Sequence, residues 1–243
     1  MIPAPLRAVI FDKDGLLLDT ETVVRTAMFK ACAELGYIME DGLHLSLIGH
    51  GRDGNDAILR AHYGADFPLA DYRERCRIHF EEICRDEVPE KPGARELLVY
   101  LKGKRIPVAV ATATGRARSE DNLRRTGFAG FVDVLVTRDD VQFSKPHPEP
   151  FLTAAERLGV LPSECLALED SHQGVRAAHA AGMATIMVPD MLKATPEIEA
   201  LCAGVLDDLH AVRALIEEAL LSRSQTQHAP PPPLAFRAVW SRR

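Results

Sequence analysis

The chain has 243 residues, of which 47% are hydrophobic and 26% charged, so it can bury one sizeable core and a smaller second unit. Its formal net charge of -6 argues against a nucleic acid polymer or an anionic membrane as partner, and no apolar run reaches the roughly 18 residues of a membrane span. The five cysteines are scattered without a CxxC pair, so we expect free thiols and a cytoplasmic location.

The first predicted element is a strand over residues 7–12 (RAVIFD), a short apolar run that ends in an acidic residue. The region 20–88 then shows helical patterns only, namely TVVRTAMFKACAELG, DGNDAILRAHYG and ADYRERCRIHFEEICRDE. About 70 residues are few for a domain but sufficient for a helical bundle. We therefore predict a helical insertion over 20–88, between the first strand and the rest of the fold.

From residue 92 onward, strand and helix patterns alternate. The predicted strands are nearly continuous apolar stretches, at 106–112, 132–137, 165–170 and 184–188. Such stretches are typical of parallel strands that are covered on both faces. The predicted helices lie between them, at 94–104, 116–126, 148–158 and 172–182. The alternation predicts an α/β fold with a doubly wound parallel sheet, built from residues 1–19 and 89–221.

The last segment, 222–243, contains four consecutive prolines at 230–233 and little periodicity. Such a composition cannot bury enough apolar surface to offset the entropy of ordering. We therefore predict a disordered tail over 222–243.

Polar residues gather at the carboxyl ends of the predicted strands or in the loops that follow them. They are Asp12, Asp14, Thr112, Lys145, Glu169 and Asp170. Each residue alone is ordinary turn or surface chemistry. Ligands of open α/β sheets, however, bind beyond the carboxyl ends of the strands, so we expect these side chains to form one site.

These residue types together suit phosphoryl transfer. Carboxylate oxygens without clustered cysteine or histidine favour Mg2+. One carboxylate can attack phosphorus, and a second can protonate the leaving oxygen and then activate water. A hydroxyl, backbone N–H groups and a lysine can stabilise the charge on the phosphoryl oxygens.

Four stretches in order resemble the motifs of the haloacid-dehalogenase-like superfamily. They are FDKDGLLLDTE at 11–21, ATATG at 111–115, SKPHPEPF at 144–151 and ALEDSHQGVRAAHAAG at 167–182. The position of the helical insertion, between the first and second motifs, resembles the branch of β-phosphoglucomutase-like phosphatases, in which such an insertion is a cap. The resemblance covers about residues 7–190 and depends on all four motifs together.

The resemblance implies a role for each candidate residue. Asp12 would be the nucleophile and Asp14 the general acid/base. Mg2+ would be held by Asp12, the backbone carbonyl of Asp14 and Asp170, with Glu169 as a helper. The phosphoryl group would be held by Thr112, the Ala113 N–H and Lys145.

One residue of the first motif departs from the family pattern. Lys13 stands where the family more often has an apolar residue. Because neighbouring side chains of an extended strand point to opposite faces, we expect Lys13 to point away from Asp12 and to leave activity intact.

The function that the resemblance implies is a Mg2+-dependent phosphomonoesterase acting through an aspartyl-phosphate. Its substrate would be a small phosphorylated metabolite of the sugar phosphate, phosphoglycolate or nucleotide type. One alternative function is a dehalogenase, which does not need Asp14, although Asp14 is present here. Another is a non-catalytic relative that binds a phosphate ligand; such relatives usually lose one of the catalytic residues, and none is lost here. A phosphomutase of the β-phosphoglucomutase type shares all four motifs, but Val24 stands near the place of its cap histidine.

Substrate specificity is expected to come from the cap. The candidates there are Glu21, His50, Arg52 and Asn55. Arg52, in GHGRDG, could bind a distal phosphate or remain a solvated loop residue, and the sequence leaves both open.

Overall fold

The computed structural model describes residues 2–48, 52–85 and 87–227 of the chain. Its sheet has six parallel strands in the order β3-β2-β1-β4-β5-β6. The strands are β1 (Ala8–Phe11), β2 (Val108–Ala111), β3 (Val134–Val136), β4 (Cys165–Glu169), β5 (Ala184–Met187) and β6 (Gly204–Val205). The chain builds the sheet outward from β1 in one direction and from β4 in the other, which confirms the predicted doubly wound fold and places its switch point between β1 and β4.

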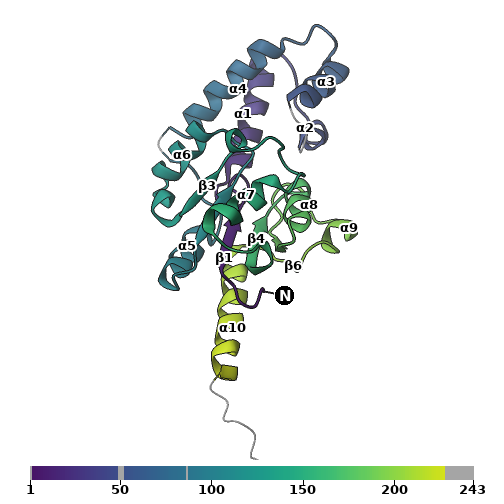
Figure 1. The fold of residues 1–243 in the computed structure, drawn as a ribbon. Coiled ribbons are helices and arrows are strands. Elements are labelled where there is room, and N and C mark those ends of the chain that lie inside the picture. Colours follow the sequence, from purple (N-terminus) through teal and green to yellow (C-terminus); the bar gives the residue numbers. More distant parts are fainter. Residues whose placement is uncertain (1, 49–51, 86, 228–243) are drawn as a thin grey trace, which may run out of the picture.

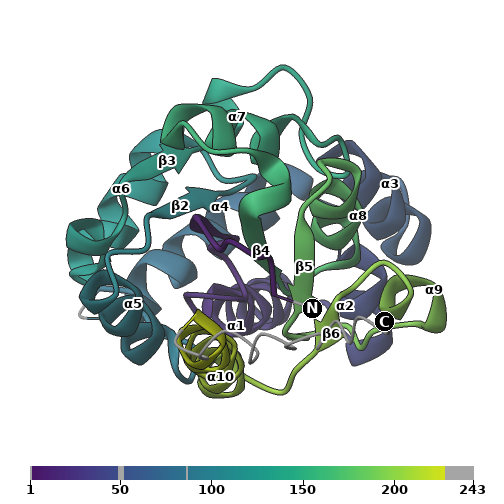
Figure 2. The same ribbon diagram turned by 60° about the horizontal axis from the view of Figure 1, so that its bottom comes forward.

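Helices cover both faces of this sheet (Figure 2). One face carries α5 (Ala94–Gly103), α6 (Arg116–Arg125) and α10 (Leu209–Gln227), and the other carries α7 (Glu149–Leu158) and α8 (His172–Ala180). Alternate residues of β1 pack against the two helical layers: Val9 and Phe11 face the first, while Ala8 and Ile10 face the second. All four side chains are fully buried, as the continuous apolar stretches predict.

Shorter elements complete the core. They are the 3-10 turns η1 (Phe128–Phe131), η2 (Arg138–Asp140) and η3 (Pro162–Glu164) and the helix α9 (Pro196–Glu199). Of the described strands, β6 has no counterpart in the sequence prediction, because two residues are too few to form a pattern.

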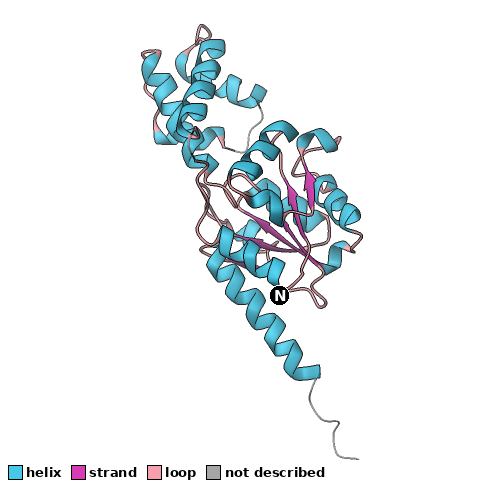
Figure 3. Ribbon diagram, turned by 90° about the vertical axis from the view of Figure 1, so that its left-hand side faces the viewer, coloured by secondary structure: helices cyan, strands magenta, loops and turns pink. Residues whose placement is uncertain are grey.

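The insertion after β1 is a bundle of helices that lies apart from the sheet (Figures 1 and 3). It contains α1 (Thr20–Glu34), α2 (Asp41–Leu47), α3 (Arg52–Tyr63) and α4 (Leu69–Ile83), of which α2 was not predicted. The bundle has its own apolar core, including Cys32, Leu59 and Phe67. It joins the sheet domain through two crossings that lie side by side, where the Asp19 N–H donates to the Pro89 carbonyl at 2.9 Å.

The C-terminal segment differs in part from the prediction of a disordered tail over 222–243. Helix α10 continues to Gln227, so residues 222–227 are helical. The remaining part of that prediction, 228–243, lies outside the described residues. Across the described ranges, every helix is too short or too polar to cross a membrane.

Candidate active site

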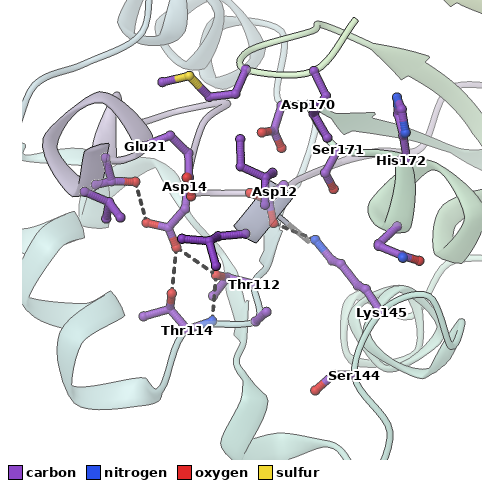
Figure 4. Close-up of a pocket in the computed structure, with 18 of the residues that line it drawn as sticks. Asp12, Asp14, Glu21, Thr112, Thr114, Ser144, Lys145, Asp170, Ser171 and His172 are labelled. Carbon is purple, nitrogen blue, oxygen red and sulfur yellow. Dashed lines mark hydrogen bonds and ion pairs between the residues drawn. The ribbon is translucent and has the colours of Figure 1, made fainter. Parts of the chain in front are cut away.

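The carboxyl ends of β1, β2 and β4 open into a cavity of about 780 Å³ between the sheet and the helical insertion (Figure 4). Its core wall contains Asp12, Asp14, Thr112, Ala113, Lys145 and Asp170. The structure therefore brings together six of the residues singled out in the sequence, from four separate segments. Glu169, the last residue of β4, is fully buried behind this wall.

Lys145 links the ends of β1 and β4. Its ammonium lies 2.5 Å from Asp12 Oδ1 and also forms an ion pair with Glu169 Oε1. The other oxygen of Glu169 accepts hydrogen bonds from Ser171 Oγ at 3.1 Å and from the Asp170 N–H at 3.2 Å. Both oxygens of Glu169 thus have donors already, which suits an anchor for Lys145 better than a metal ligand.

The carboxylates at this edge of the sheet lie close together and are buried. Burial raises the pKa of Asp12, Lys145 opposes the rise, and Glu169 and Asp14 reinforce it. Burial also raises the pKa of Asp170 well above its ordinary value, and the charges of Asp12 and Glu169 add to the effect. Burial lowers the pKa of Lys145, but the two carboxylates beside it more than offset this and raise it. The site therefore holds more negative charge than Lys145 alone compensates.

This surplus of carboxylate oxygen fits a hard cation. Asp12 and Asp170 directly follow the neighbouring strands β1 and β4, and the resemblance adds the backbone carbonyl of Asp14 as a ligand. Within the described ranges, no three His, Cys, Asp or Glu side chains form a complete metal cluster by themselves. A set of two carboxylates and one carbonyl suits Mg2+, which keeps several of its water ligands.

Gly15 leaves room for this arrangement. It has a φ of 86°, and a Cβ at this position would lie 2.3 Å from Asp170 Oδ2. An L side chain would be strained by the backbone and would displace Asp170. The DxDG sequence therefore requires its glycine for a steric reason.

Asp14 is held away from Asp12 by a separate set of donors. Its Oδ1 accepts hydrogen bonds from Lys13 Nζ at 2.9 Å and Thr20 Oγ1 at 2.7 Å. Its Oδ2 accepts from Thr114 Oγ1 at 2.7 Å and Thr112 Oγ1 at 3.3 Å, and Figure 4 shows the carboxylate directed toward these threonines. Burial acts to raise the pKa of Asp14. The charge and hydrogen bond of Lys13 and the hydroxyls of Thr114 and Thr20 outweigh this effect, so the pKa lies below its ordinary value.

Three residues in this cluster have contacts that sequence reasoning did not anticipate. Lys13 was expected to point away from Asp12 and to leave activity intact; its burial and its ion pair with Asp14 were not anticipated. Thr20 and Thr114 were not singled out at all, although both lie in the motifs DTE and ATATG. The signal that could have identified them is their position: each is a hydroxyl residue within a motif that contributes to the site.

The helical insertion supplies the opposite wall of the cavity. This wall is mainly apolar and contains Glu21, Val24, Met28, His44, Leu47, Ile48 and Asn55. Burial, and then the charges of Asp14 and Asp190, raise the pKa of Glu21 to about 7. Within the described residues, the buried Oδ1 of Asn55 has no hydrogen-bond partner, which leaves it available to a ligand.

The other two cap candidates do not join this wall in the described structure. Arg52 is exposed at the start of α3 and is absent from the residues that line the cavity. Of the two alternatives that the sequence leaves open for Arg52, the described conformation corresponds to the solvated residue, and contact with a substrate stays a prediction. His50 lies outside the described residues.

Comparison with known proteins identifies the family of this chain. The family model of haloacid dehalogenase-like hydrolases matches residues 9–188. The phosphorylated carbohydrates phosphatase of Thermotoga maritima is 35% identical over 182 residues, which cover 74% of this chain and 84% of that protein. The validoxylamine A 7'-phosphate phosphatase of Streptomyces hygroscopicus subsp. limoneus is 33% identical over 215 residues, covering 85% of this chain and 96% of that protein.

Solved structures agree as well. The chain is similar to a HAD family hydrolase from Deinococcus radiodurans with bound phosphate and sodium, with a TM-score of 0.77, 29% identity, and coverage of 90% of this chain and 98% of that one. It is also similar to CbbY from Rhodobacter sphaeroides in complex with phosphate, with a TM-score of 0.70, 29% identity, and coverage of 84% and 95%. The chain therefore belongs to the haloacid dehalogenase-like hydrolases and is a phosphatase that acts on phosphoric monoesters.

Proposed function

We propose that this phosphatase hydrolyses a small phosphorylated metabolite through an aspartyl-phosphate on Asp12. The observation that carries the proposal is the contact of Lys145 with Asp12 at the switch point of the sheet, with Asp14 two residues further on. A carboxylate beside an ammonium remains a nucleophile for an incoming phosphate, while the ammonium offsets the charge of the phosphoryl oxygens.

The reaction has two steps at Asp12. In the first, an Asp12 oxygen forms a bond to phosphorus, the bond to the leaving oxygen breaks, and Asp14 gives that oxygen a proton. In the second, Asp14 takes a proton from water, which attacks phosphorus and releases phosphate and the Asp12 carboxylate. The lowered pKa of Asp14 suits the second step, because an ionised carboxylate is the form that accepts a proton. The first step requires Asp14 in its protonated form, which the negative charge of the bound phosphate favours.

The surrounding residues hold the phosphoryl group and the cation. Thr112, the Ala113 N–H and Lys145 would bind the phosphoryl oxygens. Asp12, the carbonyl of Asp14 and Asp170 would hold Mg2+, which when bound offsets the charge between the carboxylates and the phosphate. The occupied oxygens of Glu169 support a role in fixing Lys145 instead.

The helical insertion over 20–88 acts, in this proposal, as a cap on the core of 1–19 and 89–221. The two adjacent crossings support a hinge that only a few residues need to flex. Closure would exclude bulk water and press the apolar wall around Val24 and Met28 onto the leaving group. Each of the five cysteines is free, which supports the proposal that the protein works in a reducing cytoplasm.

Hydrolysis is favoured over a mutase reaction by one observation. Val24 stands near the position of the mutase cap histidine, and its apolar side chain lines the cavity. A valine cannot pass protons between two sugar hydroxyls and a phosphate. A phosphorylated carbohydrate, as in the name of the Thermotoga maritima relative, is the substrate class that we propose.

The test is phosphate release from a panel of phosphorylated metabolites, with and without Mg2+, by wild type and the Asp12→Asn variant. We expect turnover by the wild type only, at least about 10³-fold above the variant, with both proteins folded by circular dichroism. Appreciable turnover by folded Asp12→Asn protein would show that another group attacks phosphorus.

A further inference from the structure

Lys13 lies between the two catalytic aspartates, and the reaction described above gives it no part. Its side chain is 0% exposed, and its ammonium is 2.9 Å from Asp14 Oδ1. Burying an ammonium group away from water costs several kcal/mol of folding free energy unless a well-placed partner compensates for the lost hydration. The pair with Asp14 is therefore what allows a lysine at a position where an apolar side chain would bury more easily.

The backbone of Lys13 is fixed as firmly as its ammonium. Its carbonyl accepts hydrogen bonds from the N–H groups of both Leu17 and Leu18, each at 3.0 Å. These bonds form the turn that follows β1, and Leu17 and Leu18 are themselves buried. The side chain thus extends to Asp14 from a backbone segment that these hydrogen bonds hold in place.

Lys13 is also different in kind from the other donors to Asp14. Thr20, Thr112 and Thr114 provide hydroxyls, which rotate and can turn to another acceptor. The ammonium is charged, and for the described part of the chain its one recorded partner is Asp14. Of the four donors, Lys13 therefore restrains the carboxylate most strongly.

We infer that Lys13 is a positioning residue, which fixes the carboxylate of Asp14 for proton transfer to the leaving oxygen. The inference rests on the proposed function, because it assumes that Asp14 is the general acid. A positioning role predicts that Lys13 matters in proportion to how much the leaving group needs a proton. A role of its charge alone predicts a different result: an ammonium beside Asp14 favours the ionised carboxylate, so its removal would not slow phenolate release more than the release of a leaving group that needs no proton.

Two aryl esters separate these roles. Phenyl phosphate releases phenolate, which leaves slowly without a proton, whereas p-nitrophenyl phosphate releases a stable anion that needs little help. The readout is kcat/KM, because it includes only the steps up to the departure of the leaving group. The proteins are the full chain with Mg2+, as wild type, Lys13→Met, Asp14→Asn and the double variant.

We expect Lys13→Met to lower kcat/KM for phenyl phosphate on the order of tenfold or more and for p-nitrophenyl phosphate less than about threefold. In the Asp14→Asn background, Lys13→Met should cause no further loss, because residues that act as a unit are not additive. Lys91→Met is the matched control, since Lys91 pairs with Asp190 at 2.8 Å and does not contact Asp14. Any loss in this control should be equal for the two esters.

Equal losses on both esters by Lys13→Met, or a further loss in the Asp14→Asn background, would overturn the inference. Lys13→Gln is measured alongside, because its amide can still donate to Asp14 but carries no charge; it should lose less than Lys13→Met, and its loss should again be larger for phenyl phosphate. Only variants that keep the wild-type circular dichroism spectrum are compared. Wild-type protein that releases phosphate from neither ester nor any sugar phosphate would instead overturn the proposed function. The two failures are therefore distinct.

Discussion

Glu21 gives the sharpest test of the electrostatics of the cavity. It lies in the first turn of α1, where burial and the charges of Asp14 and Asp190 raise its pKa from 4.5 to about 7, against the opposing charge of Arg118. A raised carboxyl pKa means that the folded state binds the proton more tightly than the unfolded state. The contribution of Glu21 to the free energy of unfolding is therefore complete below about pH 4.5, and it is lost as the pH rises through about 7.

The variant Glu21→Gln removes this charge with almost no change in shape. A shift from 4.5 to about 7 corresponds to a gain for the variant of at most about 3 kcal/mol at pH 8 and less than about 1 kcal/mol at pH 5. The assay is urea unfolding of both proteins with a chelator present, at each of the two pH values. The same difference in unfolding free energy at pH 5 and pH 8 would refute the reasoning.

A carboxylate with the opposite shift serves as the control for Glu21. Glu197 is exposed and paired with Arg176, which lowers its pKa. Glu197→Gln should therefore bring no gain in stability at pH 8. A gain like that of Glu21→Gln would point to a general effect of net charge instead of the local environment.

Four further predictions concern the site itself. Lys145→Met should lower kcat/KM by about 10²-fold or more, because the phosphoryl charge loses its ammonium, and steady-state rates within threefold of wild type would contradict this. Gly174→Ala should cost about 1–3 kcal/mol in urea unfolding and reduce activity, because its Cβ would lie 1.8 Å from Glu169 Cδ; unchanged stability would contradict the packing argument. Chelation should abolish phosphate release, and Asp170→Asn should raise the Mg2+ dissociation constant about tenfold or more by calorimetry, whereas full activity without metal would exclude the cation from the reaction. Asn55→Ala should raise KM for the best metabolite but not for p-nitrophenyl phosphate, and equal changes would remove Asn55 from recognition of the leaving group.

The positions of most strands and of the candidate catalytic side chains could be predicted from the sequence, because the signals are local. A continuous apolar run such as AVIF before Asp12 is sufficient to place both a buried strand and the residue at its end. The same reasoning could not find α2 (Asp41–Leu47) or β6 (Gly204–Val205), since both are too short to show a period. At the C-terminus, the polar sequence SRSQTQ at 222–227 shows no apolar period, although α10 continues through it, so the predicted tail began too early.

The pairing of charged groups could not be predicted, because it depends on contacts between distant segments. Asp12 meets Lys145 across 133 positions of the chain, and Thr114 meets Asp14 across 100. Lys13 and Asp14 are neighbours in sequence, yet an extended strand predicts that their side chains diverge. The strand β1 ends at Phe11, so Lys13 and Asp14 lie in the turn beyond it, where this alternation no longer holds.

The two crossings between the sheet and the helical bundle have a consequence for how such enzymes diversify. Backbone hydrogen bonds join Asp19 to Pro89 and Lys91 to Leu17, so the ends of the insertion are tied together at the core itself. A segment anchored in this way can change in length or content at little cost, because the entropy of closing a loop grows only slowly with its length. On the proposed function, the chemistry at Asp12 and the selection of the leaving group would therefore be separable parts of one chain. Exchange of the bundle could redirect the enzyme to a new ester while the phosphoryl site stays as it is.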